Sequence, residues 1–242
     1  MIALQLHSVR DKLFSYFAGT LEAVANMGYE GVEFAGFGDL SADEVKELLV
    51  KNNLKVVGSH TGIDQISDNL DGLIAYNKTI GNKNIVIPAA ELKTQADIDN
   101  FAKIVNSAEP KLCENGLTIF FHNHDSEFNK IGDKTILDLL FDACPNMKSE
   151  LDVCWAHVAG VNPAEYIKQN IGRTSLLHLK SYHLVDGDVV FDDISGGIVD
   201  IKEVVSVAKS LGITTMIVEN DSPQIDCLED VKHSVNYYKT LN

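Results

Sequence analysis

The sequence predicts an α/β protein, a single (β/α)8 barrel domain over residues 1–242. Short apolar segments rich in β-branched residues recur eight times, and amphipathic segments of helical periodicity separate them. A chain of 242 residues has a length at which such barrels often form one domain. The alternative, an open doubly wound sheet, is weakened because no GxGxxG follows the first apolar segment and no Walker motif occurs.

The predicted strands are mostly apolar on both faces, as expected for parallel strands that are covered on both sides. They are Ile2–Leu6, Val32–Phe34, Lys55–Ser59, Asn84–Ile87, Leu117–His122, Glu150–Val153, Leu176–Lys180 and Met216–Glu219.

Helices are predicted between the strands. The first spans Ser15–Met27, with apolar residues at helical spacing and Gly28 as its end. The second begins at Ser41, where Glu44 completes a capping box, and ends near Asn52. The others are predicted at 66–80, 95–114, 135–144, 163–170, 201–211 and 228–241. Left-handed glycine caps are expected at Gly81, Gly116, Gly172 and Gly212.

Charge and composition exclude several classes of partner. The chain has 35 acidic and 20 basic residues, a net charge of −15, which argues against binding to nucleic acid or to anionic membrane. No signal peptide is visible, and no apolar run approaches the roughly 20 residues of a membrane helix. Four cysteines without a CxxC pair read as reduced thiols. We therefore expect a cytoplasmic protein.

Polar residues follow nearly every predicted strand, at the end of a barrel where active sites lie. They are Gln5, His7, Glu33, His60, His122, Asn123, His124, Glu127, Asp152, His178, Lys180, Glu219 and Asp221. Four of them come from consecutive strands and could form a metal site: Glu127, Asp152, His178 and Glu219. Oxygen and nitrogen ligands without thiolates suit one divalent ion, Mn²⁺ foremost, or Mg²⁺, Co²⁺ or Zn²⁺.

Seven ordered stretches at these positions resemble a known superfamily. They are LQLHSVRD at 4–11, GYEGVEFAG at 28–36, GSHTG at 58–62, FHNHDSEF at 121–128, ELDVCWAHVAG at 150–160, LLHLKSY at 176–182 and IVEND at 217–221. Together they resemble the xylose isomerase-like TIM barrel superfamily, and more narrowly the sugar phosphate isomerase/epimerase group with its inosose dehydratases.

The resemblance implies a divalent ion held by Glu, Asp, His and Glu from consecutive strand ends. Asp152, His178 and Glu219 match the last three of these ligands. The first is assigned to Glu127, with His122 as the alternative, because some relatives carry their Glu nearer the strand end.

The implied function is a metal-dependent sugar or sugar phosphate isomerase or epimerase that transfers a proton next to a carbonyl through an enediolate. Glu127 and Glu219 would remove and return the proton. Side chains that would orient hydroxyls, stabilise the oxyanion or line the pocket are Lys180, His60, His122, His124, Glu33, Trp155 and His7.

Other functions remain open on the same residues. An inosose-type dehydratase or keto-sugar lyase would use the same ion and the same acid and base. An endonuclease IV-like DNA repair enzyme shares the barrel, but the net charge of −15 and the short loops argue against it. A sugar-binding barrel without catalysis is a further alternative. The resemblance makes a homo-oligomer possible, since relatives are often dimers or tetramers, but nothing in the residues specifies the oligomeric state.

Overall fold

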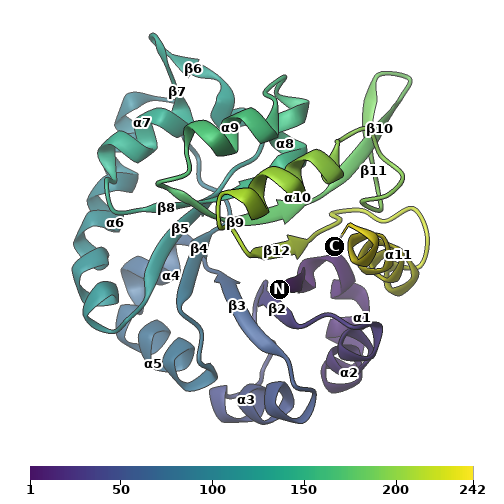
Figure 1. Cartoon of the computed structure of the whole chain (residues 1–242). Helices are drawn as coiled ribbons and strands as arrows, with labels where there is room; N and C mark the ends of the chain where they lie inside the picture. The colour runs from purple at the N-terminus through teal and green to yellow at the C-terminus, as the bar shows by residue number, and fades with distance from the viewer. Residues whose placement is uncertain (242) are drawn as a thin grey trace.

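The computed structural model describes residues 1–241 and confirms a closed barrel of eight parallel strands (Figure 1). The strands pair in the order β1-β12-β9-β8-β5-β4-β3-β2. They are β1 (Ile2–Gln5), β2 (Gly31–Phe34), β3 (Lys55–His60), β4 (Asn84–Ile87), β5 (Thr118–His122), β8 (Lys148–Asp152), β9 (Thr174–Leu179) and β12 (Thr215–Val218). Each corresponds to a predicted strand. We call the end of the barrel at the carboxyl termini of these strands the mouth.

Helices surround the barrel (Figure 1). They are α1 (Arg10–Ser15), α2 (Phe17–Met27), α3 (Ala42–Lys51), α4 (Ile63–Asp68), α5 (Leu70–Ile80), α6 (Gln95–Glu114), α7 (Ile136–Ala143), α8 (Val153–Val158), α9 (Pro163–Gln169), α10 (Ile201–Ser210) and α11 (Cys227–Thr240), with 3-10 turns η1 (Leu6–Val9) and η2 (Ser126–Phe128). The capping box predicted at Ser41 and Glu44 is present at the start of α3. No helix within residues 1–241 is long and apolar enough to cross a membrane.

Two local predictions were wrong. The helix expected over 66–80 is two helices, because Asn69 leaves the helical region with φ −144° between α4 and α5. Gly172 does not have the left-handed φ that Gly81, Gly116 and Gly212 have. The reason is that α9 has already ended at Asn170, whose backbone N–H bonds back into the helix.

The barrel interior changes from apolar to polar toward the mouth. Ala3, Phe120, Leu176 and Ile217 belong to one buried apolar cluster. Two residues further along the same strands stand Gln5, His122, His178 and Glu219, all buried. Side chains two residues apart point to the same face of a strand. The apolar cluster therefore closes the barrel below, and a layer of ionisable groups lies above it.

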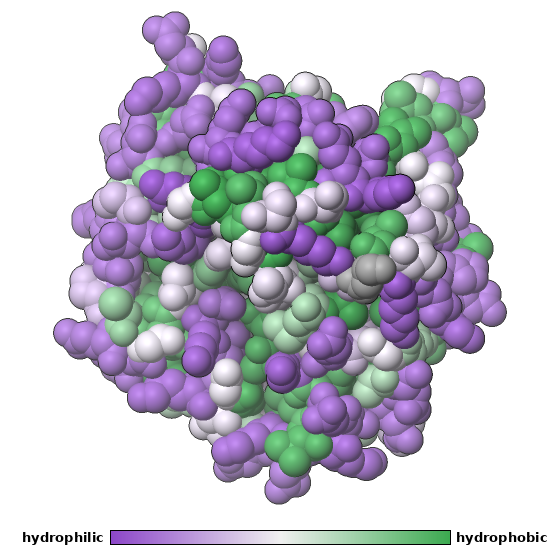
Figure 2. Space-filling model, in the orientation of Figure 1, coloured by the Kyte–Doolittle hydropathy of each residue, from purple (hydrophilic) through white to green (hydrophobic). Residues whose placement is uncertain are grey.

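Two antiparallel hairpins were not predicted. The longer one, β10 (Ser181–Val185) with β11 (Asp188–Asp192), follows β9 and projects from the barrel at the upper right of Figure 1. The short one pairs β6 (Lys130–Ile131) with β7 (Lys134–Thr135). Leu184 and Val185 are 57% and 50% exposed, and Figure 2 shows apolar surface where the longer hairpin lies.

Candidate metal centre and active site

Four side chains from consecutive barrel strands meet at the mouth. We call His122, Asp152, His178 and Glu219 the upper group. All four are buried, and one ligand atom from each lies within 4.8 Å of the others. His178 Nδ1 lies 2.9 Å from Glu219 Oε2, and His122 Nε2 lies 3.4 Å from Asp152 Oδ2. The ends of four strands bring these four side chains together. His122 and Asp152 end β5 and β8, His178 lies one residue before the end of β9, and Glu219 directly follows β12.

A buried ammonium balances the charge of the upper group. Lys180 Nζ lies 3.2 Å from Asp152 Oδ2, 2.9 Å from Glu219 Oε2 and 2.7 Å from Asp221 Oδ2. Burial opposes ionisation of Glu219, but Lys180 and His178 hold the pKa of its carboxyl well below the ordinary value. The pKa of Asp152 is lowered in the same way, against its burial, with Lys180 as the largest favourable cause. Both carboxyls are therefore ionised at neutral pH and can act as ligands or bases.

The donor set fits a divalent ion. Neither ring nitrogen of His122 has a hydrogen-bond partner within residues 1–241, although its side chain is only 3% exposed. Its Nε2 has Asp152 Oδ2 at 3.4 Å and Glu219 Oε2 at 3.8 Å as ion-pair contacts only. A buried imidazole that makes no hydrogen bond is costly, and a metal ion would use its lone pair. Two carboxylates and two imidazoles suit Mn²⁺, Co²⁺ or Zn²⁺.

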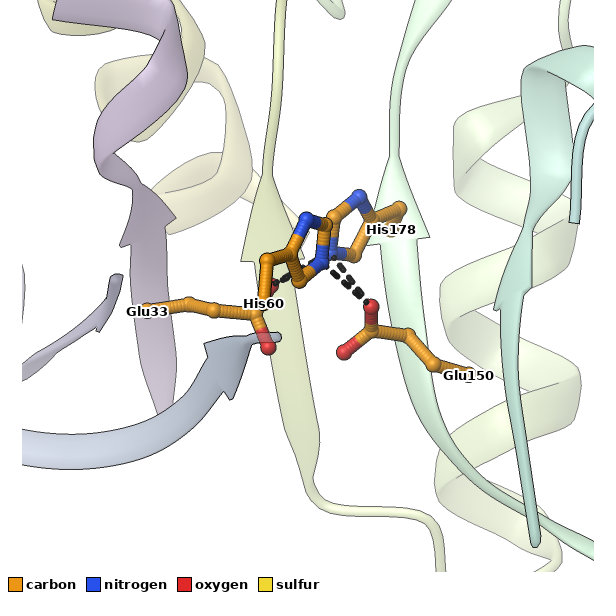
Figure 3. Close-up of side chains that lie close together, drawn as sticks. All are labelled: Glu33, His60, Glu150 and His178. Atoms are coloured by element: carbon orange, nitrogen blue, oxygen red, sulfur yellow. Dashed lines mark hydrogen bonds and ion pairs between the residues drawn. The ribbon is translucent and has the colours of Figure 1, made fainter. Parts of the chain in front are cut away.

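A second set of ligand-type residues lies next to the upper group. We call Glu33, His60, Glu150 and His178 the lower group (Figure 3). The Nε2 of His178 lies 2.7 Å from Glu33 Oε2 and 3.1 Å from Glu150 Oε2. The Nε2 of His60 lies 3.3 Å and 3.1 Å from the same two oxygens. His178 therefore faces the upper group with one ring nitrogen and the lower group with the other.

Burial alone would lower the pKa of His60, but the adjacent carboxylates of Glu33 and Glu150 have the larger combined effect. They raise the pKa of His60 to about 10. Gln5 also donates to Glu33, across 2.9 Å to Oε2.

A cavity of about 460 Å³ opens above the upper group. Its polar lining residues are His7, His60, Gln65, His122, His124, Glu219 and Asp221. Burial lowers the pKa of His7 and His124, so both imidazoles are neutral at pH 7. The cavity therefore offers carboxylates, the neutral imidazoles of His7 and His124, and the imidazolium of His60 to a bound molecule.

Glu127, the residue assigned as the first ligand, lies outside both groups. Its Oε2 accepts from the backbone N–H of His124 at 2.6 Å, and its Oε1 accepts from Ser126 Oγ at 2.8 Å. The carboxylate thus ties down the loop after β5 and the turn η2. The structure brings His122, the alternative, to the place on β5 that completes the upper group.

Two residues predicted to bind substrate, Glu33 and Trp155, are not among the residues that line the cavity. Glu33 is fully buried in the lower group and does not line the cavity, whereas it was assigned to substrate binding. Trp155 lies between His124 and Phe191, with ring centroids 5.5 Å and 5.3 Å away. Lys180 Nζ lies 5.5 Å from the Trp155 ring. Trp155 therefore backs the site rather than lining the cavity.

Two residues in or beside the site were not predicted. Glu150 stands two residues before Asp152 on β8, so the alternation of strand side chains could have identified it. Phe191, which packs against Trp155, comes from the hairpin β10–β11, and that hairpin was not predicted.

Comparisons with known proteins agree with this architecture. A family model described as xylose isomerase-like TIM barrel matches residues 21–241. No curated protein matches the sequence. A sugar phosphate isomerase/epimerase structure from Parabacteroides distasonis is 21% identical, with a TM-score of 0.84, over 98% of this chain and 96% of that one. The probable 3-DHS dehydratase AsbF of Bacillus anthracis is 15% identical, with a TM-score of 0.77, over 100% and 99%.

A third structure, of an L-ribulose 3-epimerase, is 14% identical, with a TM-score of 0.76, and covers 99% of this chain and 93% of that one. At these identities, the likeness establishes a common fold.

Proposed function

This chain belongs to the xylose isomerase-like TIM barrel family, and we propose that it is a divalent-metal-dependent sugar isomerase or epimerase. The observation that carries the proposal is the upper group of two carboxylates and two imidazoles at the floor of a cavity of about 460 Å³. The reaction would be transfer of a proton at the carbon next to a substrate carbonyl.

The four members of the upper group would hold the ion. When bound, the ion supplies Lewis acidity beside the negative charge that develops on the substrate oxygens. His122 and Glu219 also line the cavity, so the ion site and the substrate site share a wall.

Proton transfer is assigned to Glu219 and His124. Glu219 is ionised and lines the cavity, which is what a general base requires. His124 lines the same cavity as a neutral imidazole and can accept or return a proton. It replaces Glu127 in this role, because the carboxylate of Glu127 is engaged by the loop after β5.

The cavity favours an uncharged sugar. No lysine or arginine is among the described residues that line it, whereas phosphate groups are usually held by such side chains. Lys180 lies behind the wall with its ammonium engaged by three carboxylates. We therefore expect unphosphorylated keto sugars to react faster than their phosphate esters.

Deuterium exchange at the substrate α-carbon tests the proposal. In D₂O with Mn²⁺, the wild type should incorporate deuterium into a member of a panel of ketohexoses, inososes and 3-keto-glycosides, measured by NMR. Glu219→Gln should slow exchange at least about 100-fold, since a positioned acid or base contributes about that much or more. Chelation should abolish exchange and Mn²⁺ should restore it. The exposed Glu114→Gln is the matched control and should behave as the wild type.

Exchange that survives both chelation and Glu219→Gln would refute the proposal. Binding of a panel sugar without exchange would instead favour a non-catalytic barrel. Loss of water or of a β-substituent from the product would identify the dehydratase or lyase alternative on the same site.

A further inference from the structure

We propose that the lower group, Glu33, His60, Glu150 and His178, is a second site for a divalent transition-metal ion. It lies next to the ion site of the proposed function and shares His178 with it. In the view of Figure 3, the carboxylates of Glu33 and Glu150 approach from opposite sides beneath the two imidazole rings.

The four ligand atoms converge on one point between the two imidazoles and the two carboxylates. Each Nε2 of His60 and His178 faces the same two oxygens, Glu33 Oε2 and Glu150 Oε2, at 2.7–3.3 Å. Hydrogen bonds pair them one to one, His60 Nε2 with Glu150 Oε2 at 3.1 Å and His178 Nε2 with Glu33 Oε2 at 2.7 Å. Each nitrogen keeps the second oxygen 3.1–3.3 Å away without a proton to offer it. One cation among the four atoms would be bound by all of them at once.

The lower carboxylates have no ammonium partner of the kind that the upper ones have. Glu33 and Glu150 are fully buried, and their ion pairs within the described chain are with imidazoles alone. The Lys180 ammonium, by contrast, serves Asp152, Glu219 and Asp221.

Glu33 Oε1 and Glu150 Oε1 are buried and have no hydrogen-bond partner among residues 1–241. Buried carboxylate oxygens of this kind are costly unless paired or bound to a metal.

The ligand chemistry and an entry path are both present. Two imidazole nitrogens and two carboxylates suit Zn²⁺, Co²⁺ or Mn²⁺. His60 lines the cavity, so an ion can reach the lower group from the mouth. Binding at the lower group would release the Nε2 protons of His60 and His178 to solvent, and binding at the upper group would require an Nδ1 of His178 that carries no proton. With both sites filled, His178 would therefore have given up both ring protons to solvent.

Counting bound ions in selective variants tests the inference. Metal-free protein is loaded with Co²⁺, freed of loosely bound ions, and analysed by elemental mass spectrometry and Co²⁺ absorption. The wild type should retain two ions per chain, Glu150→Gln one, Asp152→Asn one, and the double variant none. Glu114→Gln should retain two. If Glu150→Gln fails to fold, His60→Asn removes a different ligand of the lower group and should also retain one ion. Anomalous scattering from crystals locates each ion.

The outcomes separate this inference from the proposed function. One wild-type ion that Asp152→Asn removes and Glu150→Gln keeps overturns the second site and leaves the lower group as ion pairs that orient His178. One ion that Glu150→Gln removes and Asp152→Asn keeps supports the lower site and contradicts the upper one. Two ions in both Glu150→Gln and His60→Asn would also overturn the inference.

Discussion

At the scale of single residues, Asp230 on α11 is a buried acid whose titration should affect stability. Its side chain is 2% exposed, Oδ2 accepts from Asn220 Nδ2 at 3.0 Å, and Oδ1 has no partner in the described part of the chain. Burial raises the pKa of Asp230 to about 6. The unfolded value is about 3.9, so the folded state holds the proton more tightly and stability falls as the pH rises from about 4 to 6.

Asp230→Asn should remove this pH dependence, because an amide does not ionise and can still accept from Asn220. At pH 7 the variant should be more stable than the wild type by at most about 2 kcal/mol. Urea unfolding at pH values from 4 to 7 measures both effects. An unchanged slope of stability against pH in the variant would contradict this assignment.

Much of the site at this scale could be predicted from the sequence, and the exceptions are local. Asp152, His178 and Glu219 lie within one residue of the ends of their strands, so barrel topology alone brings them together. Glu127 depends on how the chain turns after β5, and the 3-10 turn at η2 directs its carboxylate to the backbone of His124. Such a short turn has no periodic signal in the sequence.

At the scale of elements, the pairing of β2 with β3 creates the space for the lower group. The register shifts between Val32 and Glu33, and Glu33 then lies opposite Gly58. A Cβ at Gly58 would collide with Glu33 Oε1, because that oxygen already occupies the position. The absence of a side chain at Gly58 therefore allows Glu33 to reach His178.

Gly58→Ala should displace Glu33, cost about 1–3 kcal/mol of stability and remove the ion proposed for the lower group. Urea unfolding and the metal count of purified protein measure these effects. Gly172→Ala is the matched control, since nothing lies within 4 Å of its Cβ and its φ is ordinary. A Gly58→Ala protein with wild-type stability and metal content would disprove the close approach.

The hairpin β10–β11 was not predicted, although the sequence carries a signal for it. Asp186 and Gly187 both have positive φ and form its two-residue turn, between the paired residues Val185 and Asp188. An Asp-Gly pair between alternating apolar residues is a strong hairpin signal. The repeated strand and helix units dominated the pattern, and the hairpin lies between two of them.

At the scale of the whole molecule, ion binding should be coupled to barrel stability. The two groups draw ligands from β2, β3, β5, β8, β9 and the residue after β12, so a bound ion ties together most of the barrel. An ion at 100 times its dissociation constant adds about 2.7 kcal/mol to the free energy of unfolding. For a chain of this size, that corresponds to a rise in Tm of about 5–10 °C per site.

Thermal unfolding in a chelator and in excess Mn²⁺ measures this effect. The wild type should melt at a higher temperature with the ion, and Asp152→Asn should show a smaller rise. Equal Tm values for the wild type in the two buffers would argue against ion binding in either group.

The pairing of β1 with β12 has a consequence for synthesis on the ribosome. The first strand hydrogen-bonds the last one, and Met216 N donates to Met1 O across that seam. A nascent chain translated as far as Leu179 holds seven of the eight strands and must keep two sheet edges unpaired. During that interval Asp152 and His178 have no Glu219 beside them. Emergence of β12 and Glu219 from the exit tunnel is therefore the step that closes the barrel and completes the upper group.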